Sequence, residues 1–189
     1  QYCDWLVEAI DHIGLHEIHL FGHHTGSCLG AEIAARHPDR VLSLMMIGPV
    51  PLTKEERDEF RKHFSTPFSP TAGGEYLKAT WDYLAGLGAD NNLDLHHREM
   101  IDTARAFMGR HKTYSAVWDH DFCEYYARVS CPILLMSAED DVLHPFFERA
   151  QEMRPEAKAV TLKGANFEPD LDPDGTAAAI GSFLGTVAG

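Results

Sequence analysis

Residues 17–26, EIHLFGHHTG, contain the transition that decides the fold. The apolar positions at the start of this stretch predict a short strand, and Gly22 and Gly26 enclose three residues directly after it. Residues 27–36 then carry apolar side chains at helical spacing. We therefore expect a strand, a tight turn and a helix, with His24 at the centre of the turn.

A second register of the same glycine pattern is available one helical turn later. Residues 26–30, GSCLG, also read as two glycines around a nucleophile, and this register would place Cys28 at the turn. A turn of this kind must follow a strand directly, and the residues just before Gly26 are poor strand formers. We therefore favour His24 over Cys28.

The remaining sequence alternates between strand and helix signals. Continuous apolar runs predict further strands at 41–48 (VLSLMMIG), 133–138 (ILLMSA) and 159–164 (AVTLKG). Helical spacing is found near the start of the chain, after the glycine turn, after Pro145 and at the end. This order predicts an α/β fold, a three-layer α/β/α sandwich around a mostly parallel sheet.

Residues 52–128 differ from their flanks and predict a helical lid inserted between two parts of the core, 1–51 and 129–189. Helices are expected at 76–84 and 99–108, and the segment is rich in aromatic side chains. Aromatic side chains above a sheet edge can line an apolar ligand pocket.

The composition limits the classes of partner. The net charge is −13 with no basic cluster, which argues against a nucleic-acid partner. The apolar runs fall short of the roughly 20 residues of a membrane helix, so we expect no membrane partner and a cytoplasmic protein. The four cysteines form no C-x-x-C pair, and the 12 histidines are not expected to converge, so we predict neither a metal site nor a cofactor.

Four motifs in chain order resemble the α/β-hydrolase fold superfamily. They are GHHTG with its helix, the 41–48 strand followed by GPV and the lid, PILLMSAEDDVLHP, and LKGANFEPDLDP. The resemblance implies a catalytic acid at Asp141, with Asp140 as the alternative. It also implies that the catalytic histidine position of the family, often G-A-G-H, falls on Phe167 of this chain.

Two of the three residues that this family uses for catalysis are therefore replaced. His24 stands where G-x-S-x-G has its serine, and Phe167 cannot accept a proton. An imidazole, with an ordinary pKa of about 6.5, is itself a base near neutral pH. We expect a His24–Asp141 pair that acts on a small apolar ester, lactone or β-keto compound, with the Thr25 N–H as an oxyanion donor. The alternative is an inactive ligand-binding or assembly protein.

The resemblance also predicts the surroundings of the pair. We expect residues from the turn, the lid and the last loop to line the substrate pocket: His23, Pro49, Trp81, Trp118, His120 and Phe167. The front strands of the family fold are missing from this sequence, so the strand at 18–23 would lack a neighbour. We expect a further N-terminal segment, or a second copy in a homo-oligomer, to cover that edge.

Overall fold

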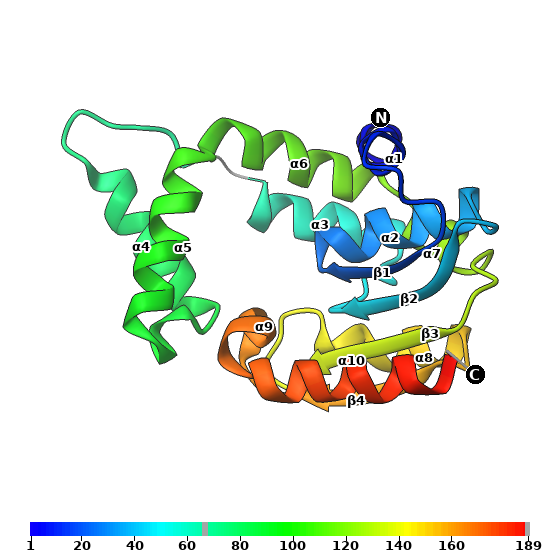
Figure 1. The fold of residues 1–189 in the computed structure, drawn as a ribbon. Helices are drawn as coiled ribbons and strands as arrows, with labels where there is room; N and C mark the ends of the chain where they lie inside the picture. Colours follow the sequence, from blue (N-terminus) through cyan, green and yellow to red (C-terminus); the bar gives the residue numbers. More distant parts are fainter. Residues whose placement is uncertain (66–67, 188–189) are drawn as a thin grey trace.

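The computed structural model of the protein describes residues 1–65 and 68–187. Its centre is a sheet of four parallel strands in the order β1-β2-β3-β4 (Figure 1). The strands are β1 (Ile18–His23), β2 (Val41–Ile47), β3 (Ile133–Ala138) and β4 (Lys158–Leu162). All three pairings are parallel, as the predicted α/β fold requires.

Helices connect the strands and cover both faces of the sheet. The α-helices are α1 (Tyr2–His12), α2 (Thr25–Arg36), α3 (Lys54–Phe64), α4 (Glu75–Gly86), α5 (Leu93–Arg105), α6 (Phe107–Asp119), α7 (Phe122–Tyr126), α8 (Phe147–Met153), α9 (Glu168–Leu171) and α10 (Pro173–Val187). Three 3₁₀ turns accompany them: η1 (Ala89–Asn91), η2 (His144–Phe146) and η3 (Ala165–Phe167).

Two hydrophobic cores lie on opposite faces of the sheet. Alternate residues of the central strands belong to one core or the other, because successive side chains of a strand point to opposite faces. Leu44 and Met46 of β2 pack in the larger core, with α2, α7 and α8. Met45 and Ile47 pack in the smaller core, against Phe183 and its neighbours on α10. The three-layer α/β/α arrangement predicted from the sequence is confirmed.

Helices α3 to α7 form the long insertion between β2 and β3 (Figure 1). Thr53 begins α3 with a capping box in which it exchanges hydrogen bonds with Glu56. Glu56 also accepts two hydrogen bonds from Arg149 of α8, at 2.5 and 2.9 Å, which ties α3 to the core. The helix expected at 99–108 is wrong as one unit, since α5 ends at Arg105 and α6 begins at Phe107. The domain limits at 51/52 and 128/129 stay a prediction.

Strand β1 lies at one edge of the sheet. Phe21 on this strand is 44% exposed, and Trp5 on the neighbouring α1 is 55% exposed. The predicted cover over this edge, by a preceding segment or a second copy, stays a prediction.

Among the helices of the described residues, none is both long and apolar enough to span a bilayer.

Candidate active site

His24 occupies a strained turn between β1 and α2. Its backbone has φ 48° and ψ −104°, a conformation that side chains other than glycine rarely adopt. The turn is so tight that a Cβ atom on Gly22 would lie 2.2 Å from the carbonyl oxygen of Gly26. Only glycine at position 22 allows the backbone of residue 26 to come this close. The bend directs the His24 ring outward from the carboxyl end of the sheet.

The ring of His24 contacts the carboxylate of Asp141, from the loop after β3. His24 Nε2 and Asp141 Oδ2 are 2.8 Å apart, and the Asp141 side chain is fully buried. The Leu143 N–H donates to the other carboxylate oxygen at 2.7 Å. An ionised carboxylate can only accept, so the ring proton must lie on Nε2 and the lone pair on Nδ1.

The charge state of Asp141 is set by opposing effects. Burial alone raises its pKa, but the hydrogen bond from His24 and the charge of that ring lower it, and the net pKa lies below the ordinary value. Asp141 therefore stays ionised near neutral pH. Asp140, the alternative acid, is exposed and accepts a hydrogen bond from the Ala165 N–H at 3.1 Å. The structure thus brings Asp141, and not Asp140, to His24.

Gly48 makes the His24–Asp141 contact sterically possible. It follows β2 with φ +58°, and a Cβ atom here would lie 2.2 Å from Cδ2 and 2.6 Å from Nε2 of His24. The same atom would lie 3.1 Å from Asp141 Oδ2. The His24 imidazole occupies the space that a side chain at position 48 would fill.

Cys28, the alternative centre of the turn, lies inside α2 and is buried. Burial raises the pKa of its thiol to about 12, so the thiolate is scarcely populated at neutral pH. The neighbouring Ser27 hydroxyl donates to the carbonyl oxygens of Gly22 and Ile47 and is also fully buried. The Ser27 side chain holds the turn in place, and neither side chain has the accessibility of a nucleophile.

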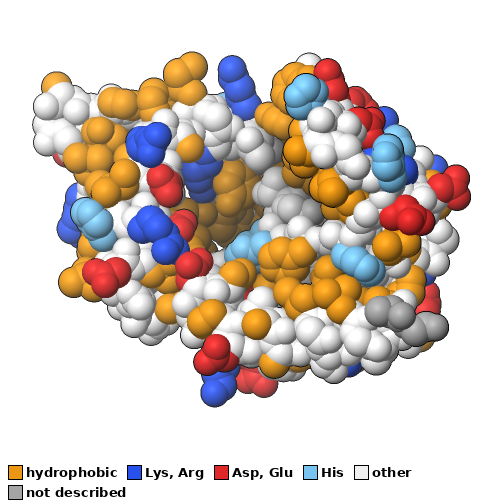
Figure 2. Space-filling view, in the orientation of Figure 1, with side chains coloured by type: hydrophobic (Ala, Val, Ile, Leu, Met, Phe, Trp, Pro, Cys, Tyr) orange, Lys and Arg blue, Asp and Glu red, His pale blue; other side chains and the backbone are white. Residues whose placement is uncertain are grey.

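A cavity of about 260 Å³ opens above the turn, between the sheet edge and the helical insertion. Figure 2 shows this face hollowed between α4–α5 and the rest of the molecule, with hydrophobic side chains inside the hollow. His23, His24 and Thr25 lie at its base, and the sequence-predicted residues Trp118 and Phe167 line its walls.

Three of the predicted pocket residues do not line this cavity. Pro49 is buried, and its neighbour Val50 reaches the cavity in its place. Trp81 stacks on the ring of His96 with centroids 3.6 Å apart. His120 faces a second cavity on the far side of α2, with Nε2 3.1 Å from a Glu32 carboxylate oxygen.

The sequence did not reveal the polar wall of the cavity. Arg110 of α6 lies over the rings of Tyr83 and Tyr114, at 5.0 and 4.6 Å from their centroids, and donates a hydrogen bond to the Tyr83 hydroxyl at 2.9 Å. Burial raises the pKa of Tyr83 to about 12, so its hydroxyl stays neutral. A single arginine within a surface-like helix carries no sequence signal for this position.

Comparisons with known proteins identify the family of this fold. A family model described as alpha/beta hydrolase fold matches residues 1–145. The chain belongs to the alpha/beta hydrolase fold family. This hydrolase-fold chain is 28% identical over 203 residues to a fluoroacetate dehalogenase from Burkholderia sp.. The match includes 94% of this chain and 66% of the dehalogenase.

Further matches have lower identities. A putative carbamate hydrolase, RutD, from Caulobacter sp. (strain K31) is 26% identical over 152 residues, which are 75% of this chain and 54% of the relative. The chain thus spans about half to two thirds of these curated relatives. The solved structure of E-2-(acetamidomethylene)succinate hydrolase superimposes with a TM-score of 0.72 at 23% identity, over 97% of this chain and 72% of that one.

A bromoperoxidase from Bacillus anthracis gives a TM-score of 0.79 at 16% identity, over 97% of this chain and 72% of that one. At these identities the solved structures establish the fold alone. The coverage of about 70% agrees with the predicted absence of the front strands from this part of the hydrolase fold.

The start of α2 lies directly above the strained turn. Thr25 begins α2 and lines the cavity, and the first N–H groups of a helix have no intrahelical acceptor. The Ser27 N–H already donates to the His24 carbonyl oxygen at 2.9 Å, which leaves the N–H groups of Thr25 and Gly26 for a developing negative charge above His24. Phe167, at the family histidine position, contributes an aromatic ring to the cavity wall.

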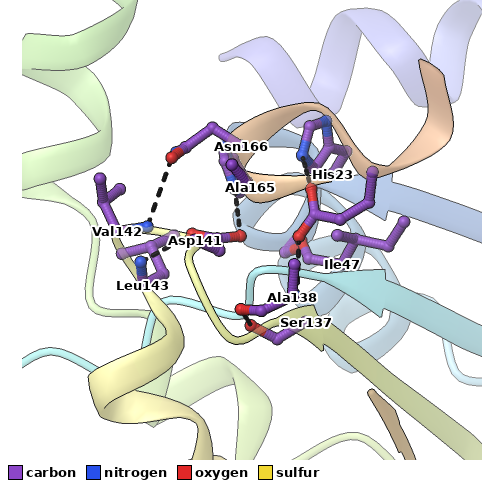
Figure 3. Close-up of polar contacts among 12 residues, drawn as sticks. His23, Ile47, Ser137, Ala138, Asp141, Val142, Leu143, Ala165 and Asn166 are labelled. Atoms are coloured by element: carbon purple, nitrogen blue, oxygen red, sulfur yellow. Dashed lines mark hydrogen bonds and ion pairs between the residues drawn. The ribbon is translucent and has the colours of Figure 1, made fainter. Parts of the chain in front are cut away.

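A second buried acid lies beside the first. Glu168, the first residue of α9, has a fully buried side chain whose Oε1 accepts the Ala138 N–H at 3.1 Å. Its Oε2 lies 3.2 Å from His23 Nε2 (Figure 3). Burial raises the pKa of Glu168, and the neighbouring charge of Asp141 raises it further. Asn166 is also buried and accepts the Val142 N–H at 3.3 Å.

Two histidines converge at this point, contrary to the sequence expectation that the histidines stay apart. His23 and His24 have ring centroids 4.0 Å apart because the strained backbone between β1 and α2 turns both side chains to one side. Together with Glu168 they offer three ligand atoms within 4.8 Å of one another.

Proposed function

We propose that this chain carries the active site of a hydrolase in which His24, oriented by Asp141, acts as the general base. The observation that carries the proposal is the 2.8 Å contact between His24 Nε2 and Asp141 Oδ2 at the base of the cavity. Dyads of this kind fix the tautomer and the orientation of the imidazole, which are what a base needs.

The chemistry follows from the two ring nitrogens. Nε2–H donates to Asp141, so Nδ1 holds the lone pair that removes a proton from water or from a carbon next to a carbonyl. The water oxygen then attacks the carbonyl carbon, and the negative charge on the former carbonyl oxygen lies near the first N–H groups of α2, including that of Thr25. Asp141 stabilises the imidazolium formed in this step. The imidazolium then returns the proton to the leaving group as the bond between that group and the carbonyl carbon breaks.

The cavity supports a small and mostly apolar substrate. Its walls near the lid are aromatic: Phe60, Phe64, Tyr114 and Trp118. An ester, a lactone or a β-keto compound combines such an apolar body with one polarisable carbonyl group. The names of the relatives, a dehalogenase and a carbamate hydrolase, support the hydrolytic class in general terms.

The test is a screen of short esters, lactones, carbamates and β-keto esters, followed by His24→Ala and Asp141→Asn. We expect both variants to lose about 10²- to 10⁴-fold in kcat on any substrate that the wild type turns over. His97→Ala, an exposed lid histidine, is the matched control and should retain full activity. Undiminished turnover by His24→Ala would exclude the proposed base.

A second candidate function is a ligand-binding protein without turnover. The observation in its favour is Phe167, which places an aromatic ring in the cavity where the family has its catalytic histidine. In that case ligands found by thermal-shift screening should bind equally well to wild type and to Asp141→Asn, and no substrate in the screen should be consumed.

A further inference from the structure

His23 and Glu168 form a pair beside His24 that has no part in the proposed base catalysis. His23 ends β1 and Glu168 begins α9, and both side chains meet next to His24. One atom from each of these three residues, a ring nitrogen or a carboxylate oxygen, lies within 4.8 Å of the others. Imidazole nitrogens and carboxylate oxygens are the usual protein ligands of zinc.

Two of the atoms that meet here have no hydrogen-bond partner among the described residues. His23 Nε2 and Glu168 Oε2 are both buried and lie 3.2 Å apart, a distance within the range of an ion pair. A fully buried carboxylate oxygen without a hydrogen bond is costly, and this one faces the two imidazoles.

The charges around this point also favour a cation. Glu168 and Asp141 both have fully buried side chains, and a buried carboxylate needs a nearby positive group or a hydrogen-bond donor. Asp141 Oδ2 lies 2.8 Å from His24 Nε2, so a second carboxylate borders the same group of atoms. A divalent ion would offset both charges at once.

We propose that His23, His24 and Glu168 form a binding site for a divalent transition-metal ion such as Zn²⁺. Metal–ligand bonds of about 2.0–2.2 Å in a tetrahedral site hold the ligand atoms about 3.3–3.6 Å apart, so the widest pair would close by roughly 1 Å. Two imidazole ligands select Zn²⁺, Co²⁺ or Ni²⁺ over Mg²⁺ and Ca²⁺. The ion has a route to the site, because both rings line the cavity.

The site has a consequence for the proposed base, and this consequence alone rests on the proposed function. A metal on His24 uses either the Nδ1 lone pair or the Nε2 atom that donates to Asp141. In both cases the imidazole can no longer remove a proton. Zn²⁺ therefore inhibits the proposed hydrolysis, and a chelator restores it.

The direct test measures binding without any substrate. Metal-free protein is titrated with Zn²⁺ by calorimetry and with Co²⁺ by visible absorption, which reports the coordination geometry. We expect one ion per chain at this site, a tetrahedral Co²⁺ spectrum, and no response to Mg²⁺. His23→Ala and Glu168→Gln should each weaken binding by at least about 10-fold, and Glu168→Gln keeps the hydrogen bond from Ala138 and so the local fold.

Exposed histidines of the lid can bind zinc weakly, so His97→Ala serves as the control and should bind like the wild type. Circular dichroism confirms that each variant is folded. Absence of a tetrahedral Co²⁺ spectrum, or unchanged affinity in folded His23→Ala and Glu168→Gln, would overturn the metal site.

The two proposals fail separately. If the wild type binds no Zn²⁺ but His24→Ala is inactive, the metal site is wrong and the base remains. If Zn²⁺ binds and depends on Glu168 while His24→Ala keeps its activity, the metal site is supported and the base is excluded.

Discussion

Substitution of Gly48 by alanine tests the central geometry with a single methyl group. The new Cβ would lie 2.2 Å from His24 Cδ2, whereas ordinary contact begins near 3.4 Å, so the ring must move by about 1.2 Å. The methyl group also faces the Asp141 carboxylate at 3.1 Å, so the ring cannot keep its partner while it moves. The 2.8 Å bond between His24 and Asp141 should therefore break.

The expected magnitude has two parts. An L-residue at φ +58° costs roughly 1–2 kcal/mol in free energy of folding, and loss of a hydrogen bond to a charged group costs about 1.5–3 kcal/mol. The sum is about 3–5 kcal/mol, which for a chain of this size lowers Tm by roughly 10 °C. A displacement of about 1 Å at a catalytic group also lowers the rate by about 10²-fold.

The assay is urea unfolding followed by tryptophan fluorescence, together with turnover of any substrate from the screen. Gly26→Ala is the control from the same turn, because a Cβ there meets no atom within 4 Å and the residue lies in α2. We expect Gly26→Ala to be neutral or more stable by up to about 1 kcal/mol. If Gly48→Ala unfolds at the wild-type urea concentration and keeps its activity, the close packing of His24 against Gly48 is refuted.

Three further predictions concern the frame around the site. Glu56→Gln should destabilise the protein by about 1 kcal/mol at pH 7, because hydrogen bonds from Arg149 lower the pKa of Glu56 to about 2. Since the pKa of Glu56 is depressed in the folded state, its stabilisation is present above pH 4.5 and is lost as the pH falls towards 2. The urea unfolding curves of wild type and Glu56→Gln should therefore approach each other near pH 3. An equal difference in stability at pH 7 and pH 3 would contradict the ion pair. Burial raises the pKa of the Cys28 thiol to about 12, so Cys28 should resist iodoacetamide in the folded protein and react in urea. Mass spectrometry of the peptides measures the labelling. Rapid labelling of the folded protein would favour Cys28 again as the residue at the turn. Gly22→Ala should yield little folded protein, because its Cβ would lie 2.2 Å from the backbone oxygen of Gly26, and a soluble variant with the wild-type Tm would disprove that backbone contact.

The local part of the site could be predicted from the sequence because it depends on neighbouring residues. The glycine spacing and the preceding strand predicted the strand–turn–helix unit, and the structure places His24 at its bend. The choice between Asp140 and Asp141 remained open, since either could follow β3. Only the hydrogen bonds of the folded chain separate them, one to Ala165 and the other to His24.

The distant contacts could not be predicted, because they join residues far apart in the sequence through the sheet edge. The sequence carries no signal that Glu168, at the start of α9, is buried and lies 3.2 Å from His23 at the end of β1. Trp81 was expected in the pocket, but it stacks on His96 of the next helix in the lid. Aromatic and acidic residues have more than one way to be buried, and tertiary packing decides between them.

The position of β1 at the end of the sheet implies two populations of backbone amides along one strand. Ile18 and His24 donate their N–H groups to β2 and its flank, so by the two-residue repeat Leu20 and Gly22 point the same way. The amides of His19 and Phe21 face the opposite, unpaired side in the described residues. In deuterated water these two should exchange within the earliest time points while Leu20 stays protonated, and slow exchange at Phe21 would reveal that another strand occupies the edge in solution.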